Sequence, residues 1–363
     1  MNKEIENVLK KITKSGFKSY LVGGYVRDYL LGLKSVDVDI ATSANPSDLI
    51  KIFPDAKIDS NYGSIKFSTQ HYKFDITTFR EEIYNNDKLE TNYVDDLYID
   101  ALRRDFTINS IYMDFRGNII DPYNGVKDLK NKILKMIGNA NLRYKEDPLR
   151  ILRTIRLKTQ LGFNVEKTTI EALEKHKFLL KKISYFRKKE ELNKMFISQN
   201  KLEGLELLKQ YNLHELLDIE YNKVKFTTDP LGIWAQINFN EYYPFTKQEK
   251  NIIKKLRNFT SLTNENIYKN GLYISLIASE ILGFDKLEVN IIYKNLPIKD
   301  RKDIKINYKK LINLGYKDNE INGIIKMLEA EILNGNLKNN RKSIIKYFNS
   351  RKWEYEQTNR VNH

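Results

Sequence analysis

The sequence predicts an α+β protein with its strands in the first part of the chain and helices in the rest. Short runs of alternating apolar and polar residues, typical of strands, recur from Tyr20 to about residue 137. From Asn141 onward this pattern fades, and apolar residues recur at helical spacing. The length of 363 residues favours two to four domains.

Composition limits the class of protein. The chain has no cysteine and four scattered histidines, which excludes disulfides and cysteine zinc sites. No apolar run is long enough to cross a membrane, and residues 1–18 lack the apolar core of a signal peptide. We therefore expect a cytoplasmic protein without a membrane partner. The net charge of +15 suggests a polyanionic partner, although a general richness in lysine explains it equally well.

The most informative stretch is LVGGYVRDYLLGLKSVDVDIAT, residues 21–42. An amphipathic helix around Ile5–Ile12 precedes it, and a strand, Tyr20–Val22, opens it. At Gly23 and Gly24, the absence of a Cβ lets backbone N–H groups approach a ligand. The next segment, Tyr25–Leu31, reads as a short helix whose N-terminus points back at the glycines, which makes this turn a candidate anion site.

Two acids follow on a predicted strand, Val36–Ala41. Asp37 and Asp39 point to the same face, because side chains alternate along a strand. Adjacent carboxylates repel each other unless a divalent cation neutralises them, and hard oxygen ligands suit Mg²⁺. Asp75, on a further strand at Lys73–Arg80, is a candidate third catalytic acid, although a lone Asp on a strand is usually solvated. Glycines and acids together predict nucleoside triphosphate chemistry.

The remaining elements of the first part are short. Polar, aperiodic residues at Glu81–Glu90 predict a mobile loop. The other predictions are a helix at Ser47–Phe53, two strands within Ile58–Gln70 around a turn at Asn61–Gly63, a helix within Val94–Arg104, strands at Ile111–Phe115, Asn118–Asp121 and Lys132–Ile137, and a turn at Asp121–Gly125.

A second dense motif, RRDFTIN, spans residues 103–109. Arginines such as Arg104 give bidentate contacts to phosphate oxygens. Asp105 can accept a hydrogen bond from a ribose hydroxyl, and Asn109 adds an amide. By itself the cluster would also fit a surface ion-pair group at a helix end.

The second part reads as helices with two breaks, at Lys223–Leu231 and Tyr242–Thr246. In the final run, Glu320–Trp353, basic residues alternate with aromatics, which suits RNA contacts and an ordinary amphipathic helix about equally. The predicted helices are Leu149–Leu161, Phe186–Ile197, Leu202–Leu217, Lys247–Thr260, Asn264–Leu282, Lys286–Lys294 and Lys299–Leu314.

Three ordered motifs resemble the class II tRNA nucleotidyltransferase and poly(A) polymerase family: the glycine and DxD stretch, RRDFTIN, and Glu146-Asp147-Pro148-Leu149-Arg150, which is similar to the family's EDxxR element. The resemblance implies a nucleotidyltransferase head with a mixed β-sheet and helices at 1–137. It further implies an all-α neck at 138–196 that selects the base, a body at 197–282, and a tail at 283–363 that binds tRNA.

The implied reaction is template-independent addition of C, C and A to the 3′ end of tRNA from CTP and ATP, with release of pyrophosphate. The basic helical part would grip the acceptor and T arms. In this family Asp37 and Asp39 would hold Mg²⁺. The other residues that the resemblance assigns to nucleotide binding are Gly23, Gly24 and Arg27 for the triphosphate, Arg104, Asp105 and Asn109 around the ribose, and Asp147, Arg150, Arg153 and Arg156 in the neck.

Asp147 and Arg150 are predicted to select the base. Three positions apart on a helix, they would share a face. Cytosine and adenine both present an amino donor beside a ring-nitrogen acceptor, which a carboxylate and a guanidinium complement, whereas uracil and guanine present the reverse. A simpler alternative remains, in which Asp147 is an N-cap and Pro148 the first helical residue.

Three other functions stay open. A poly(A) polymerase typically carries a basic GRRF-like stretch, where this chain has NYGSIKF at 61–67. An enzyme that adds only CC or only A would differ in the segment before RRDFT, which is somewhat short and poor in arginine here. The third alternative is an RNA-binding protein without catalysis. The two adjacent acids argue against it, because binding alone does not require two acids facing a polyanion.

Overall fold

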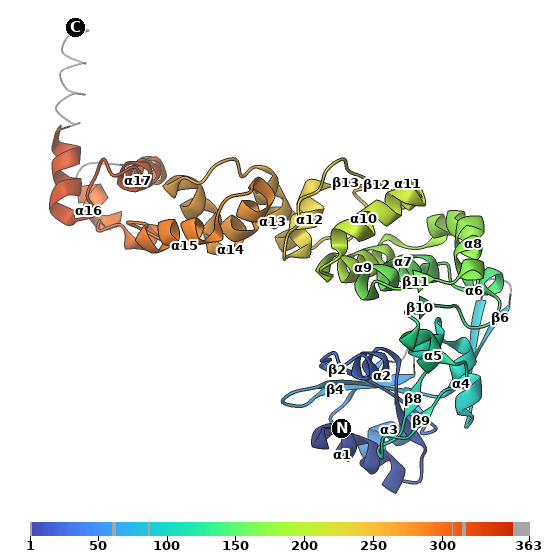
Figure 1. The fold of residues 1–363 in the computed structure, drawn as a ribbon. Coiled ribbons are helices and arrows are strands. Elements are labelled where there is room, and N and C mark those ends of the chain that lie inside the picture. Colours follow the sequence, from blue (N-terminus) through green and yellow to red (C-terminus); the bar gives the residue numbers. More distant parts are fainter. Residues whose placement is uncertain (1, 60–62, 86–87, 307, 314–316, 351–363) are drawn as a thin grey trace. The chain divides into compact units, whose positions relative to one another are not determined.

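The computed structural model describes residues 2–59, 63–85, 88–306, 308–313 and 317–350 (Figure 1). The chain forms two compact units, 1–219 and 220–363. Four predicted features fall partly outside the described residues, namely the turn at Asn61–Gly63, the loop at Glu81–Glu90, the helix Lys299–Leu314 and the basic run that ends at Trp353. The division into four domains remains a prediction.

The first unit is built on a seven-stranded sheet with the strand order β3-β4-β5-β2-β1-β8-β9. Only β2 and β5 run parallel to each other, so the sheet is mixed, and the predicted α+β class is confirmed. The strands are β1 (Ser19–Val22), β2 (Asp37–Thr42), β3 (Lys57–Asp59), β4 (Ser64–Ser68), β5 (Lys73–Thr78), β8 (Tyr112–Met113) and β9 (Ile119–Ile120).

Helices cover the two faces of this sheet unequally. On the apolar face, α1 (Lys3–Lys14) packs against β1, and the Ser19 hydroxyl donates to the carbonyl of Leu9. α3 (Pro46–Ile52) lies against β4 on the same face; Asn45 caps its first turn and Pro46 begins it. On the other face, Leu97 and Ala101 of α4 (Leu97–Arg103) cluster with Val22 of β1, Ala41 of β2 and Tyr112 of β8. Lys57 of β3 and Lys66 of β4 are exposed on this second face, which we call the open face of the sheet.

The predicted mobile loop at Glu81–Glu90 is wrong. This segment forms a separate hairpin of β6 (Arg80–Asn85) and β7 (Lys88–Tyr93), with Ile83 opposite Glu90. A two-stranded ribbon that stands apart from the main sheet buries little apolar surface. Its sequence therefore lacks the alternation on which strand prediction depends.

Helices complete the first unit, with α7 packed between α9 and α10. The predicted helix Leu202–Leu217 is two helices, because Asn212 has a φ of 55°. α5, α6 and α8 were not predicted. The remaining elements are α2 (Gly23–Leu30), η1 (Thr107–Asn109), α5 (Gly125–Lys130), β10 (Ile133–Leu134), α6 (Ala140–Glu146), α7 (Leu149–Leu161), β11 (Asn164–Val165), α8 (Lys167–His176), η2 (Lys177–Lys182), α9 (Tyr185–Ile197), α10 (Lys201–Gln210) and α11 (Leu213–Leu216).

The second unit is largely helical, as predicted. One apolar cluster runs from Leu256 to Phe348, across the predicted boundary between residues 282 and 283. The predicted helix Lys299–Leu314 is wrong, since a short turn and a separate helix take its place. The elements are β12 (Ile219–Glu220), α12 (Pro230–Gln236), β13 (Asn238–Phe239), α13 (Lys247–Arg257), α14 (Asn264–Leu282), α15 (Lys286–Asn295), η3 (Arg301–Asp303), α16 (Tyr308–Asn313) and α17 (Asp318–Leu333).

No helix in the described part of the chain is long and apolar enough to cross a membrane.

Candidate active site

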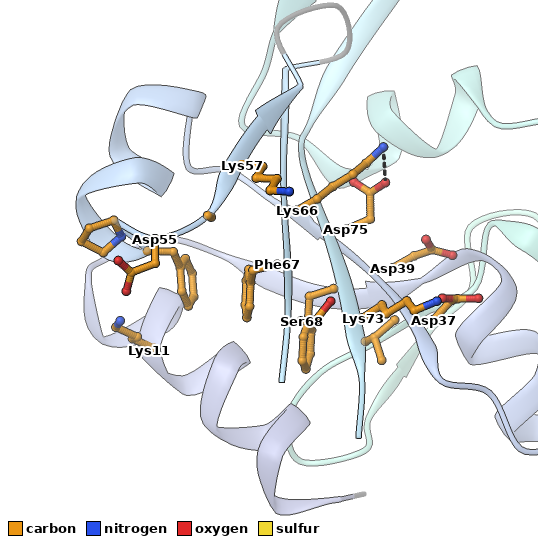
Figure 2. A pocket seen from close by; sticks show the side chains of 15 residues that line it. Lys11, Asp37, Asp39, Asp55, Lys57, Lys66, Phe67, Ser68, Lys73 and Asp75 are labelled. Atoms are coloured by element: carbon orange, nitrogen blue, oxygen red, sulfur yellow. Dashed lines mark ion pairs between the residues drawn. The ribbon is translucent and has the colours of Figure 1, made fainter. Parts of the chain in front are cut away.

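Strand pairing places the predicted acids side by side on the open face of the sheet. Asp39 of β2 lies in register with Asp75 of the parallel strand β5. Asp37 lies two residues before Asp39 and shares its face. All three line a pocket of about 770 Å³, and Figure 2 shows Asp75 and Asp39 on neighbouring strands beside it. The geometry thus groups the three acids that the sequence nominated.

Asp39 is the acid most affected by its surroundings. Burial raises its pKa to about 6; Arg104 lowers it, whereas the charges of Asp75 and Asp37 raise it further. The ionised form is therefore disfavoured in the protein alone. A bound cation would reverse this effect, because it stabilises the charged carboxylate.

The carboxylate oxygens of these acids are suitable ligands for a hard divalent cation. Oδ1 of Asp75 is buried and has no hydrogen-bond partner, whereas its Oδ2 lies 3.3 Å from Nζ of Lys66. A buried carboxylate oxygen without a donor calls for an ion or water. No set of three or more His, Cys, Asp or Glu side chains within the described residues converges as a complete metal site. Mg²⁺ commonly takes only one or two carboxylates and fills its shell with water and substrate phosphates.

The glycine turn packs directly against Asp39. α2 begins at Gly23 rather than at the predicted Tyr25, and Gly23 has a φ of 69°. The backbone N–H of Gly24 donates to the Asp39 carboxylate. A Cβ on Gly23 would lie 2.8 Å from Oδ2 of Asp39. Glycine is therefore favoured at Gly23 both by its backbone conformation and by the close approach of the Asp39 carboxylate.

We expect Gly23→Ala to reduce activity at least about a hundredfold, because displacing a reacting group by even 1 Å can cost that much. Gly32→Ala is the matched control, since Gly32 has a φ of 72° and nothing lies within 4 Å of its added Cβ. Both variants should lose about 1–2 kcal/mol of stability through the left-handed backbone. Steady-state incorporation and thermal unfolding would measure the two effects, and equal activities in the two variants would contradict the steric argument.

Beyond the glycine turn, a continuous network of hydrogen bonds joins Arg27 of α2 to Arg153 of α7. Nη1 of Arg27 donates to Oδ1 of Asn109 at 2.8 Å, and Nδ2 of Asn109 donates to Oδ1 of Asp105 at 3.0 Å. Nε of Arg153 then donates to Oδ2 of Asp105 at 2.8 Å. Asp28 pairs with Arg27 at 2.7 Å, so it orients that arginine. Four residues nominated for nucleotide binding thus contact one another.

Asp105 is buried and fully engaged in this network. Its Oδ1 also accepts from the backbone N–H of Phe106, so both oxygens have donors. Burial alone would raise the pKa of Asp105, but Arg153, Asn109 and that N–H together hold it well below its usual range. Asp105 is therefore an ionised acceptor whose position depends on the helix that carries Arg153.

Arg104 is fixed by a residue that the sequence analysis missed. Nη2 of Arg104 lies 2.9 Å from Oδ2 of the fully buried Asp100, and the Tyr112 hydroxyl donates to the same oxygen. Burial opposes ionisation of Asp100, but Arg104, Arg103 and Tyr112 lower its pKa to about 2. The available signal was the spacing on a predicted helix, where Asp100 precedes Arg103 by three residues and Arg104 by four.

The predicted pairing of Asp147 with Arg150 on one helical face is wrong. α7 begins at Leu149 after an N-cap at Pro148, and Asp147 has non-helical dihedrals at the end of α6. Asp147 instead pairs with Arg187 of α9 at 3.0 Å. Arg150 is buried and donates to Glu146 at 2.9 Å. The Asp-Pro dipeptide separates Asp147 from the helix that begins, as predicted, at Leu149.

Arg156 and the hairpin depend on two further acids that the sequence analysis did not assign to the site. Nε of Arg156 donates to Oε2 of Glu191 at 2.6 Å, in the middle of α9. In the hairpin, Glu82 accepts from Arg80, two residues away on β6, at 2.7 Å and lies 3.5 Å from Arg103. Tertiary packing brings Glu191 to Arg156 and Glu82 to Arg103.

Three family models match the chain in order. The poly(A) polymerase head domain matches residues 19–135, the RNA- and SrmB-binding site of polymerase A matches 162–219, and domain 2 of tRNA nucleotidyltransferases matches 244–348. The first match covers the sheet, the glycine turn and all three acids. The third falls within the second unit.

Relatives match over nearly the whole length. A CCA-adding enzyme of Ligilactobacillus salivarius (strain UCC118) is 36% identical over 93% of this chain and 94% of its own. One of Streptococcus pneumoniae (strain CGSP14) is 32% identical over 95% and 96%. The crystal structure of the Bacillus stearothermophilus CCA-adding enzyme in complex with CTP superposes with a TM-score of 0.82 and 25% identity, covering 99% of this chain and 100% of that one. The Thermotoga maritima CCA-adding enzyme complexed with tRNA shares the fold, with a TM-score of 0.63, 20% identity and 96% of each chain covered.

Proposed function

The chain belongs to the tRNA nucleotidyltransferase family of CCA-adding enzymes, and from this premise we propose that it adds C, C and A to the 3′ end of tRNA from CTP and ATP. The observation that carries the proposal is the side-by-side placement of Asp39 and Asp75 in register, with the glycine turn packed against Asp39. This arrangement offers a phosphate-binding backbone next to a group of carboxylates.

In the proposed step, the 3′ oxygen of the RNA forms a bond to the α-phosphorus of the nucleotide. The bond from that phosphorus to the bridging oxygen breaks, and pyrophosphate leaves with the electron pair. The hydroxyl proton passes to a carboxylate, for which Asp75 is the candidate, or to water. The glycine turn at Gly23 and Gly24, with Arg27, would hold the leaving phosphates, and the Gly24 N–H would exchange its bond to the Asp39 carboxylate for one to a phosphate oxygen.

Asp37 and Asp39 would hold Mg²⁺, with Asp75 beside them. When bound, this cation would neutralise the phosphate charge and favour the ionised form of the attacking oxygen. The identity of the metal as Mg²⁺ and the cytoplasmic location stay predictions.

Arg27, Asn109, Asp105 and Arg153 would bind the ribose and the phosphates and transmit the position of α7 to the glycine turn. Every polar atom named in this network already has a partner in the protein. We therefore propose that nucleotide binding exchanges some of these contacts for contacts to the substrate. Arg104 and Arg156 would support the site through Asp100 and Glu191.

We still propose that Asp147 and Arg150 select the base of the incoming nucleotide, although Asp147 ends α6 and Arg150 lies in α7. The Asp147 carboxylate lies partly exposed between the Leu149 N–H and Arg187. This leaves acceptor capacity on Oδ2 for the amino group of cytosine or adenine. Arg150 would have to exchange a contact to Glu146 for the ring nitrogen.

We expect Asp147→Asn to reduce discrimination against UTP by about tenfold or more, because the amide can donate where the carboxylate only accepts. Stability should hardly change, since Asn caps about as well as Asp and the exposed pair with Arg187 contributes at most about 1 kcal/mol. Competition between CTP, ATP and UTP on one tRNA would measure the preference. Wild-type preference in this variant would leave Asp147 with a local structural role alone.

The function itself is tested by product sequencing. The protein would be incubated with tRNA that ends at the discriminator base, with CTP, with ATP, and with both. The proposal predicts two Cs from CTP alone and a complete CCA end from the mixture. Addition of CC only, addition of A only, or a run of A would each identify one of the alternative activities and overturn the proposal.

A further inference from the structure

A single row of side chains crosses the open face of the sheet at the height of the carboxylates. Strand pairing puts Asp39 in register with Asp75, Asp75 with Lys66, and Lys66 with Lys57. On its other side, Asp39 is in register with Val22, which immediately precedes the glycine turn. The acids therefore lie between the glycine turn at one end of the row and two lysines at the other. Figure 2 labels the two acids and the two lysines.

The chemistry of the transfer gives this order a direction. In an in-line displacement, the attacking and leaving oxygens lie on opposite sides of the phosphorus. If the leaving pyrophosphate is held at the glycine turn, the attacking oxygen has to arrive from the side of Asp75. Beyond Asp75 in that direction, the RNA chain that carries the attacking oxygen meets Lys66 and then Lys57.

We propose that Lys57 and Lys66 form the seat for the backbone of the RNA 3′ end, where they contact the phosphates of the last nucleotides. This inference rests on the proposed function and adds the side from which the RNA enters. Neighbouring strands are roughly 4.8 Å apart, so the three steps from Asp39 to Lys57 span roughly 14 Å, or about four stacked nucleotides at 3.4 Å each.

Charge and accessibility agree with this assignment. Both lysines are exposed and line the same pocket as the three acids. Nζ of Lys66 lies 3.3 Å from Asp75 and reduces the repulsion between that carboxylate and an approaching phosphate. Lys73 adds a further positive charge to this pocket, in register with Asp37. α4 packs on this face against residues of β1, β2 and β8, whereas both lysines lie on β4 and β3 and are exposed there.

Lys57 allows the clean test, because it is in register with Lys66 and not with an acid. In the full-length protein, Lys57→Glu should lower kcat/KM for a tRNA ending in CC at least about tenfold at saturating ATP, because a repulsion replaces an attraction to phosphate. The dissociation constant of ATP without tRNA and the thermal midpoint should not change. Lys57→Arg should retain near wild-type kcat/KM.

Lys14→Glu is the matched control for net charge. Lys14 is exposed at the end of α1, on the opposite face of the sheet, and its variant should behave as wild type. A wild-type kcat/KM for tRNA in Lys57→Glu would overturn the proposal. Weaker binding of ATP by this variant would also overturn it, because it would assign the lysine to the triphosphate. Failure of the proposed function would show separately, as a wild-type protein that does not extend tRNA.

Discussion

Replacing Asp39 by Asn is expected to remove nucleotide incorporation while leaving the first unit at least as stable as before. Loss of a metal-binding carboxylate should cost several kcal/mol of transition-state stabilisation, about a thousandfold or more in rate. Stability should not fall, because burial and the charges of Asp75 and Asp37 already disfavour the ionised Asp39. A neutral amide of the same shape removes that repulsion.

Incorporation of radiolabelled ATP into tRNA ending in CC, together with thermal unfolding without metal, would measure both effects. Asp114→Asn is a suitable control, since this exposed acid lies in a turn outside the pocket, where it accepts from Asn118. Substantial incorporation by Asp39→Asn would contradict the assignment. A large loss of stability would show instead that Asp39 is structural.

Replacing Asp105 by Ala is expected to destabilise the first unit by about 3 kcal/mol, because the buried Asp105 is the nearer ionic partner of the partly exposed Arg153, which then keeps Glu191 at 3.7 Å. For a unit of this size the thermal midpoint would fall by about 10 °C. Activity should fall as well, because Asp105 links Asn109 and Arg27 to α7.

The pH dependence of the free energy of unfolding in the acidic range offers a second measurement. The pKa of Asp105 lies below its usual range in the folded protein, so its contribution is present above the ordinary carboxyl pKa and is lost as the pH falls below it. Asp105→Ala should therefore flatten the pH dependence there. The double variant Asp105→Ala, Arg153→Met should recover part of the stability, since removing both partners leaves no unpaired charge. If Asp105→Ala alone were as stable as wild type, a structural role for the ion pair between Asp105 and Arg153 would be excluded.

The catalytic acids could be predicted from sequence because their grouping depends on short-range geometry. Two residues apart on a strand, Asp37 and Asp39 share a face in any sheet, and the glycines that precede them allow only a close turn. Asp75 was a weaker prediction, since its place beside Asp39 depends on the parallel pairing of β2 with β5, which lie more than thirty residues apart in the chain.

The errors have a common cause in tertiary packing. The hairpin of β6 and β7 has no apolar alternation because it stands apart from the sheet. Asp147 and Arg150 were placed on one helix, whereas Pro148 separates their segments and Arg187, forty residues away, supplies the partner of Asp147. Glu191 meets Arg156 only when α7 and α9 pack together. Local periodicity carries none of this information, although the spacing of four residues between Asp100 and Arg104 was a local signal that the sequence analysis did not use.

The most direct test of the site is a crystal structure of the protein with CTP and Mn²⁺ in place of Mg²⁺. The account predicts an anomalous scattering peak bound to both Asp37 and Asp39, with the β- and γ-phosphates against the backbone of Gly23 and Gly24. A peak away from these carboxylates, or a triphosphate lying over Lys57 and Lys66, would contradict it.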